Sequence, residues 1–316
     1  MACRVLLLAV LAFPALAQET WPARAVRLIV PSSPGGGTDL YGRLLAQGLS
    51  EALRQQFIVD NRPGASGNIG AEIAAKATPD GYTFLVTAQP AIVINPSLYR
   101  NLPYNAERDF APVARGVVSP LAFASHPSLP VKSLPALAAL GKREPEKLPY
   151  GSAGAGSALN LVVKMVEEAT GARFVHVPYK GVGPALQALL SGDVAFVASD
   201  LGAVLPHVRS GRVIALAVTE KTHLLPMTPS LADAGYPGIQ ASAGFMVVAP
   251  AGTPPEVIRR MSVEINRVMK SPAVREKLDG QGFIPVFDTP EAFAASLKRQ
   301  RQRWADVIRR HKIVVE

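Results

Sequence analysis

The stretch VPSSPGGGTDLYGRLL (Val30–Leu45) places three consecutive glycines, Gly35 to Gly37, between an apolar run and a helical pattern of leucines. A short β-branched run followed by a glycine-rich turn and a helix is typical of a β-to-α connection in an α/β domain. The first N–H groups of a helix lack intrahelical partners, and the helix dipole adds partial positive charge there. Because glycine leaves the backbone bare, the stretch predicts either an anion site or a plain structural turn.

A second stretch, KLPYGSAGAGSALNLVV (Lys147–Val163), repeats this order of strand, small-residue turn and helix. Two such turns predict two sites that hold one anion from opposite sides, at the carboxyl ends of strands. Neither turn matches G-x-x-x-x-G-K-[ST] or G-x-S-x-G, and neither has the spacing of a dinucleotide-binding turn. The turns therefore indicate neither a nucleotide-binding loop nor a nucleophilic serine.

The rest of the chain alternates short strand-like runs with helical patterns, which predicts α/β domains with largely parallel sheets. The runs are at 26–30, 57–61, 83–87, 147–151, 174–179, 194–199 and 213–219, and the helices are at 40–49, 69–76, 159–169, 184–190 and 204–210.

Two apolar, extended segments, Gly116–His126 and Ser242–Gly252, differ from this alternation. We interpret them as two passages of the chain between domains, although both could be ordinary strands of one domain. The first domain would then be discontinuous, with residues 18–117 and 244–316. Residues 118–243 would form the inserted second domain.

The N-terminus has the pattern of a secretory signal peptide over residues 1–17, with Arg4, an apolar core and a small-x-small site ending at Ala17. The single cysteine, Cys3, would leave with it, so the mature chain would have no disulfide and no thiolate. No later segment is apolar for long enough to span a membrane. We therefore expect an exported, periplasmic protein.

The formal net charge of +9 raises the question of nucleic-acid binding. The basic residues are scattered, aromatic residues are few, and export removes most nucleic-acid partners, so we predict none. The dense run from Lys298 to Lys312 is interpreted as a solvated helix with Trp304, Val307 and Ile308 facing inward.

Several polar residues have both a structural and a ligand-binding interpretation. Thr38 is an expected helix cap and Asp39 is placed to pair with Arg43, although both could instead contact a ligand. Ser152 and Ser157 could equally donate to an anion or cap the helix. Asp200 ends a strand and could cap the next helix or recognise a ligand amine or hydroxyl. The five histidines lack ligand spacing, and no local signature supports a catalytic triad, so we predict no metal, no cofactor and no catalytic residue.

Six segments in combination carry a family resemblance that covers the mature chain: RLIVPSSPGGGTDLYGRLLA, VDNRPGASGNIGAE, TPDGYTFLV, YGSAGAGSALNL, HVPYKGVGPALQALLSGDV and APAGTPPEVI. The chain resembles the Bug family, the extracytoplasmic solute-binding proteins of tripartite tricarboxylate transporters. The resemblance implies a type II periplasmic binding protein fold: two α/β domains, joined by crossing hinge strands, that close on a small carboxylate. It also implies that the ligand carboxylates meet the two glycine-rich turns, partly through waters.

Carried onto this sequence, the resemblance implies a ligand site formed by three segments and two single positions. These are Ser33, Gly35, Gly36, Gly37, Thr38 and Asp39; Ala88 and Gln89; Ser152, Ala153, Gly154 and Ser157; and Tyr179 and Asp200. The chain departs from the family pattern at Ser32–Ser33, where an aromatic-Pro pair is more usual. It departs again at Asn160, Ala195 and Ala243, where His, Asp and Trp are common. The extra hydroxyls and the missing aromatic would permit a more polar pocket.

These observations favour a monomeric receptor that delivers a di- or tricarboxylate, an acidic amino acid or another organic acid to membrane permease subunits. Two alternatives stay open. One is a secreted hydrolase that uses the cleft between the domains, and the other is a receptor that reports to a membrane sensor.

Overall fold

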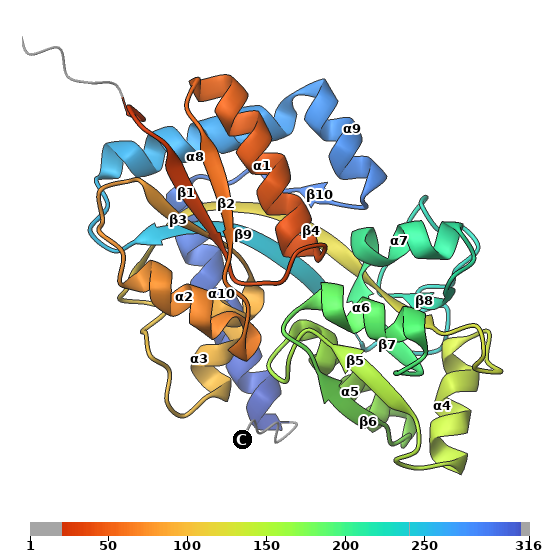
Figure 1. Ribbon diagram of the computed structural model, residues 1–316. Helices are drawn as coiled ribbons and strands as arrows, with labels where there is room; N and C mark the ends of the chain where they lie inside the picture. Colours follow the sequence, from red (N-terminus) through yellow and green to blue (C-terminus); the bar gives the residue numbers. More distant parts are fainter. Residues whose placement is uncertain (1–20, 240, 311–316) are drawn as a thin grey trace, which may run out of the picture.

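The structure is a computed structural model that describes residues 21–239 and 241–310. The described chain forms one mixed sheet in the order β2-β1-β3-β9-β4-β7-β5-β6, with β10 and β8 also paired to β4 (Figure 1). We call the β2-to-β9 side the first half and the β7-to-β6 side the second half. The strands are β1 (Val26–Val30), β2 (Phe57–Asn61), β3 (Thr83–Ala88), β4 (Phe110–Ser125), β5 (Pro149–Ser152), β6 (Val175–Pro178), β7 (Phe196–Asp200), β8 (Ile214–Val218), β9 (Ser242–Pro250) and β10 (Ile284–Pro285).

The helices pack against these strands in two groups (Figure 1). The first half carries α1 (Gly37–Leu53), η1 (Ala65–Gly67), α2 (Asn68–Ala75), η2 (Pro90–Ile94), α3 (Asn95–Leu98), α8 (Pro255–Lys270), α9 (Pro272–Gly280) and α10 (Pro290–Arg310). The second half carries α4 (Leu134–Arg143), α5 (Ala158–Thr170), α6 (Val182–Ser191) and α7 (Leu201–Arg209). The alternation predicted from the sequence is therefore present, with boundaries shifted by a few residues.

The two segments singled out as passages between domains are the two long strands at the centre of the sheet. β4 and β9 pair antiparallel from Phe110 opposite Pro250 to Pro120 opposite Ser242. β9 also pairs with β3, whereas the end of β4 pairs with β7 and β8. The chain thus passes between the halves once in each direction. The boundaries at 117/118 and 243/244 stay a prediction.

The expectation of largely parallel sheets is correct only away from the centre. β1 pairs parallel with β2 and β3, and β5 pairs parallel with β6 and β7. β4, β8, β9 and β10 pair antiparallel. The difference has a simple cause, because β4 leads into the second half and β9 leads back from it.

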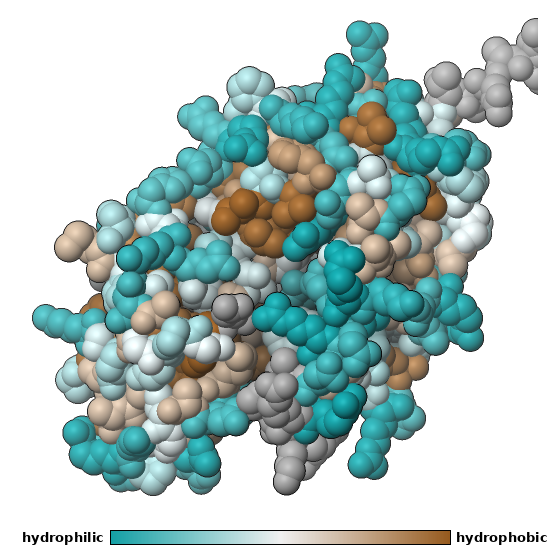
Figure 2. Space-filling model, turned by 180° about the vertical axis from the view of Figure 1, so that it is seen from behind, coloured by the Kyte–Doolittle hydropathy of each residue, from teal (hydrophilic) through white to brown (hydrophobic). Residues whose placement is uncertain are grey.

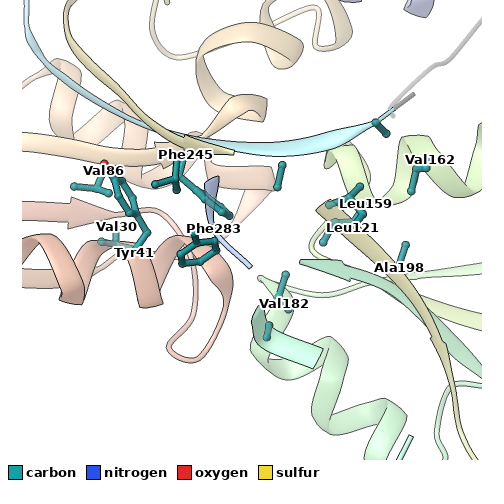
Figure 3. Close-up of a cluster of buried hydrophobic side chains, with 14 of the residues drawn as sticks. Val30, Tyr41, Val86, Leu121, Leu159, Val162, Val182, Ala198, Phe245 and Phe283 are labelled. Carbon is teal, nitrogen blue, oxygen red and sulfur yellow. The ribbon is translucent and has the colours of Figure 1, made fainter. Parts of the chain in front are cut away.

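The hydrophobic core runs through both halves. Tyr41 and Phe245 stack with ring centroids 6.2 Å apart, and Phe245 meets Phe283 edge-on. Figure 3 shows these rings on one side and Leu159 and Val182 on the other, all in one buried cluster. The sheet is therefore held as a single packed unit in this conformation.

The C-terminal helix α10 agrees with the predicted amphipathic pattern. Ile308 is buried and Trp304 is half-buried, whereas Lys298, Arg299 and Arg303 are exposed. The side chain of Val307 lies outside the described residues. From behind, the surface is mostly hydrophilic with a smaller hydrophobic area (Figure 2). The predicted signal peptide also lies outside the described residues, and within them no helix is long and apolar enough to cross a membrane.

Candidate ligand-binding site

A cavity of about 70 Å³ lies where the parallel strands of both halves end. That volume accommodates several water-sized groups, which suits a small organic molecule better than a single ion. Its walls come from nine short segments of the described chain. They are Pro31 and Ser32; Gly36, Gly37 and Thr38; Gly64, Ser66 and Gly67; Thr87 to Ala91; Ala153; Ser157, Ala158 and Leu159; Lys180, Gly181 and Val182; Asp200; and Ala243, Gly244 and Phe245.

Five α-helices of the described chain begin at this cavity. The wall includes the first residue or the N-cap of α1, α2, α5, α6 and α7. Each of these helices follows a parallel strand, and the carboxyl ends of parallel strands lie at one edge of a sheet. Their N-terminal N–H groups and dipoles therefore converge on one space, which favours an anion there.

The first glycine turn begins α1 without a side-chain cap. Gly36 is the N-cap, and Thr38, the expected cap, lies one residue inside the helix at Gly37–Leu53. Gly37 N–H donates instead to Asp200 Oδ2, 3.3 Å away and 163 positions along the chain. A Cβ at Gly37 would lie 2.6 Å from that oxygen and 2.7 Å from the Phe245 ring. Position 37 must therefore be glycine, because Asp200 and Phe245 leave no room for a side chain.

Asp39 has structural partners. Its carboxylate accepts hydrogen bonds from Arg43 Nε at 2.9 Å, Gly35 N–H at 3.0 Å and Asn61 Nδ2 at 2.9 Å. Burial alone raises the pKa of this carboxyl, but these donors outweigh burial and hold it below its usual value. Asp39 is not among the residues that line the cavity.

The nearest neighbour of the first turn across the cavity is the start of α6. A Cβ at Gly36 would lie 3.2 Å from Val182 Cβ, and one at Gly181 would lie 3.0 Å from Ser33 N. Ser33 Oγ donates to the Lys180 carbonyl at 2.9 Å. Glycines on both sides therefore let two backbones from opposite halves approach each other.

The second turn is capped by its own residues. Ser157 is the N-cap of α5, and its Oγ accepts from Asn160 N–H at 3.2 Å, which is one of the two roles that the sequence left open for it. Asn160 donates to the Ala155 carbonyl at 2.6 Å and accepts from the Tyr150 hydroxyl at 2.5 Å. The departure from the family pattern at Asn160 thus supplies a local brace.

Across the cavity the second turn meets the segment at 64–67. Gly156 N–H donates to Ser66 Oγ at 3.1 Å, and a Cβ at Gly154 would lie 2.6 Å from that oxygen. Gly64, Ala65, Ser66 and Gly67 all have positive φ. Positive φ is unfavourable for Ala and Ser, and such strain is concentrated at functional sites.

Ser152 and His176 form a pair that superficially resembles catalytic machinery. Ser152 Oγ lies 2.7 Å from His176 Nε2. Burial, with Lys164 nearby, lowers the pKa of His176 to about 4. However, Ser152 is fully buried and outside the cavity wall, and no described carboxylate is bonded to His176. The pair lacks both substrate access and an orienting acid, so it fixes the turn.

Asp200 occupies the N-cap position of α7, but its side chain makes no capping bond there. It is 4% exposed, and burial raises its pKa to about 6, opposed by the Gly37 N–H. Among the described lining residues it is the only acid, and Lys180 is the only base. It lies in the cavity wall, and its contact with a ligand stays a prediction.

Eight of the fourteen predicted site residues line the cavity. They are Gly36, Gly37, Thr38, Ala88, Gln89, Ala153, Ser157 and Asp200. The other six, Ser33, Gly35, Asp39, Ser152, Gly154 and Tyr179, lie in or beside the wall-forming segments without lining it. Their predicted contact with ligand stays a prediction.

The lining residues outside the predicted site include Gly64, Ser66, Gly67, Lys180, Gly181, Val182, Ala243, Gly244 and Phe245. Most of these residues could have been found from the segments RPGASGNIG and KGVG, because both place glycines between a strand and a helix. Ala243, one of the departures from the family pattern, contributes only a methyl group to the cavity wall. The described residues include no group of acids and histidines that could hold a metal.

The chain matches the family described as "Tripartite tricarboxylate transporter family receptor" over residues 42–313. The protein BugT of Bordetella pertussis is 39% identical over 294 residues, which cover 92% of this chain and 90% of BugT. This protein belongs to the tripartite tricarboxylate transporter receptor family. The family consists of solute-binding receptors rather than enzymes, and the resemblance to Bug proteins is confirmed.

Solved structures of similar sequence share the fold. The periplasmic binding protein BugD is 30% identical with a TM-score of 0.90 and covers 94% of this chain and 100% of its own. Rpa4515 of R. palustris with adipate is 34% identical with a TM-score of 0.89, covering 93% and 99%. MatC of Rhodopseudomonas palustris with bound malate is 29% identical with a TM-score of 0.86, covering 91% and 100%. The receptor thus has the two-domain α/β fold of periplasmic binding proteins.

Proposed function

We propose that this receptor works in the periplasm, where it captures a small organic carboxylate in the cavity between the two halves and presents it to the membrane subunits of a tripartite tricarboxylate transporter. The observation that carries the proposal is the convergence of five helix N-termini on one cavity. Two relatives whose structures contain adipate and malate support the same ligand class.

The carboxylate would lie between Gly36 and Gly37 on one side and Ser157 on the other, as the paired turns suggest. One helix terminus contributes up to about 2 kcal/mol when partly buried. Micromolar affinity requires about −8 kcal/mol. Several N–H donors must therefore act together, and the cavity has them on both sides.

Capture would require the halves to separate about β4 and β9, with residues 118–243 moving as the inserted domain. Three contacts across the cavity would break on opening: Ser33 with Lys180, Gly37 with Asp200, and Ser66 with Gly156. We expect the receptor to act as a monomer, because each chain has both walls of its cavity.

Native mass spectrometry of the exported protein, purified without refolding, tests the ligand class. We expect one intact carboxylate per chain and no product of ester, phosphate or peptide hydrolysis. Turnover that disappears in Ser152→Ala would instead support the hydrolase alternative. Ligand exchange with reconstituted transporter membrane subunits would separate transport from sensing.

Gly36→Val tests the position of the ligand. Gly36 has φ −85°, so the backbone accepts a side chain, but the added methyl groups would face Val182 and the cavity. Ligand at about 100 times its Kd stabilises a receptor by about 2.7 kcal/mol. The variant should lose that thermal shift and Gly36→Ala should reduce it. Gly280→Val is the matched control, since nothing lies within 4 Å of a Cβ there. Equal shifts in all four proteins would move the site elsewhere.

A further inference from the structure

Two hydrogen-bond acceptors in the cavity wall lack adequate donors. Asp200 accepts one bond, from Gly37 N–H at 3.3 Å, although a carboxylate has room for about four. Gln89 is nine-tenths buried, and its Oε1 has no donor among the described residues. Buried acceptors normally have partners, so an amide oxygen with no donor and a carboxylate with only one, both from residues of the same wall, call for an explanation.

The surroundings do not neutralise Asp200. The described residues form no ion pair with it, and Lys180, the one basic residue of the wall, is exposed. Ser199 and Leu201 flank it in the chain and contribute no charge. An acid that is buried without a cation must either bind a proton or meet a donor from outside the protein.

The orientation of Gln89 follows from its neighbours. Its Nε2 donates to Gln300 Oε1 at 3.1 Å, and Gln300 Nε2 donates to Ser296 Oγ at 3.1 Å. This chain of donors leads away from the cavity into α10. Because Nε2 is the donating atom, Gln89 Oε1 can only accept a hydrogen bond. The amide packs against Gly244, where a Cβ would lie 2.8 Å from Gln89 Nε2.

A plain carboxylate would fit this wall poorly. Its charge would suit the five helix N-termini but would meet the Asp200 carboxylate in a space of about 70 Å³. Two like charges in a buried site repel strongly. A hydroxyl or an ammonium group near the ligand carboxylate would remove the conflict, because it would donate to the acceptors while the carboxylate meets the N–H groups.

We propose that the ligand carries a hydroxyl or ammonium donor on the carbon next to its carboxylate, and that Asp200 and Gln89 receive this donor. This inference rests on the proposed function and narrows it to 2-hydroxy and 2-amino acids. Asp200 and Gln89 are then specificity-determining residues.

Two matched series of acids test the inference by titration calorimetry on mature receptor freed of retained ligand. The first is succinate, malate and aspartate, and the second is glutarate, 2-hydroxyglutarate and glutamate. We expect the substituted acids of at least one series to bind about tenfold or more tightly than the plain acid. Asp200→Asn and Gln89→Leu should each shrink that ratio. Asp60→Asn is the control, because Asp60 pairs with Arg62 outside the cavity.

The outcomes separate the inference from the function on which it rests. The inference is overturned, and the receptor function left intact, if succinate and glutarate bind as tightly as their substituted analogues and binding takes up a proton. The inference is also overturned if the ratio of affinities between substituted and plain acids is unchanged in both Asp200→Asn and Gln89→Leu. A retained ligand without such a donor, identified by mass, also overturns it. If no acid binds and the retained ligand is not a carboxylate, both proposals fail.

Discussion

The turn at 33–37 and the turn at 151–157 both place small residues between a strand and a helix, but they are stabilised in different ways. The second turn is closed by its own residues, with Ser157 capping α5 and Asn160 bracing Ala155. The first has a glycine N-cap: Gly35 N–H donates to Asp39 in the same segment, but Gly37 N–H donates to Asp200 in the other half. The second turn thus has its helix cap from within and one bond across the cavity, from Gly156 N–H to Ser66, whereas the helix start in the first turn depends on a partner that closure of the halves supplies.

The two turns also differ in the titrating group beside each. Burial raises the pKa of Asp200 to about 6, beside the first turn, and burial with Lys164 lowers that of His176 to about 4, beside the second. Burial thus shifts each pKa in the direction that favours the neutral form of the group. Their effects on stability have opposite pH dependence and partly offset each other between pH 4 and 6.

Asp200→Asn should give the largest change and tests the dependence of the first turn on its distant partner. The folded state binds this proton more tightly than the unfolded chain, so stability falls as pH rises from 3.8 to about 6. A shift of this size corresponds to roughly 3 kcal/mol, which the amide avoids. Urea unfolding should show the variant more stable by about that amount at pH 7 and no more stable than the parent at pH 3.5. A variant that is less stable at pH 7 contradicts this account.

Asn160→Ala should have the next largest effect, on the self-contained turn. It leaves the Tyr150 hydroxyl and the Ala155 carbonyl without partners, and Tyr150 is fully buried. We expect a loss of about 2 kcal/mol in the free energy of unfolding. Double substitution with Tyr150→Phe should recover part of this loss, and its failure to do so would show that Asn160 acts through another contact.

Ser157→Ala removes the cap of α5 and should cost about 1 kcal/mol. Ser157→Asp keeps an acceptor at the cap and should retain most of the stability. Thermal unfolding of both variants checks the assignment. If Ala and Asp destabilise equally, the Ser157 hydroxyl acts mainly through the Gly154 carbonyl, to which it donates at 2.7 Å.

His176→Asn should give the smallest change in stability at pH 7, where the histidine is neutral in both the folded and the unfolded chain, and its effect should be visible only in the pH profile. The unfolded chain binds a proton on this histidine more tightly, so its effect is a stability that rises with pH between about 4 and 6.5. Without the histidine, the opposing slope from Asp200 should dominate, and stability should fall as pH rises over that range. If the pH profile of stability is identical to that of the parent, His176 does not contribute to the pH dependence.

Much of the fold follows from patterns within a few residues. The strands at Val26–Val30 and Phe57–Asn61 coincide with apolar runs, and α5 (Ala158–Thr170) follows the second glycine turn where a helix was expected. The antiparallel centre was not predicted. An apolar run marks a strand, but the direction of its neighbour depends on how the chain returns from the second half.

The sequence by itself determined that two glycine turns each precede a helix, and that Asp39 pairs with Arg43 one turn away. These features depend on local spacing, which the order of residues sets directly. Only the tertiary structure decided what meets those turns: Asp200 at Gly37, Val182 at Gly36 and Ser66 at Gly156. Partners 90 or more positions apart are brought together by the packing of whole elements, and no local pattern encodes that packing.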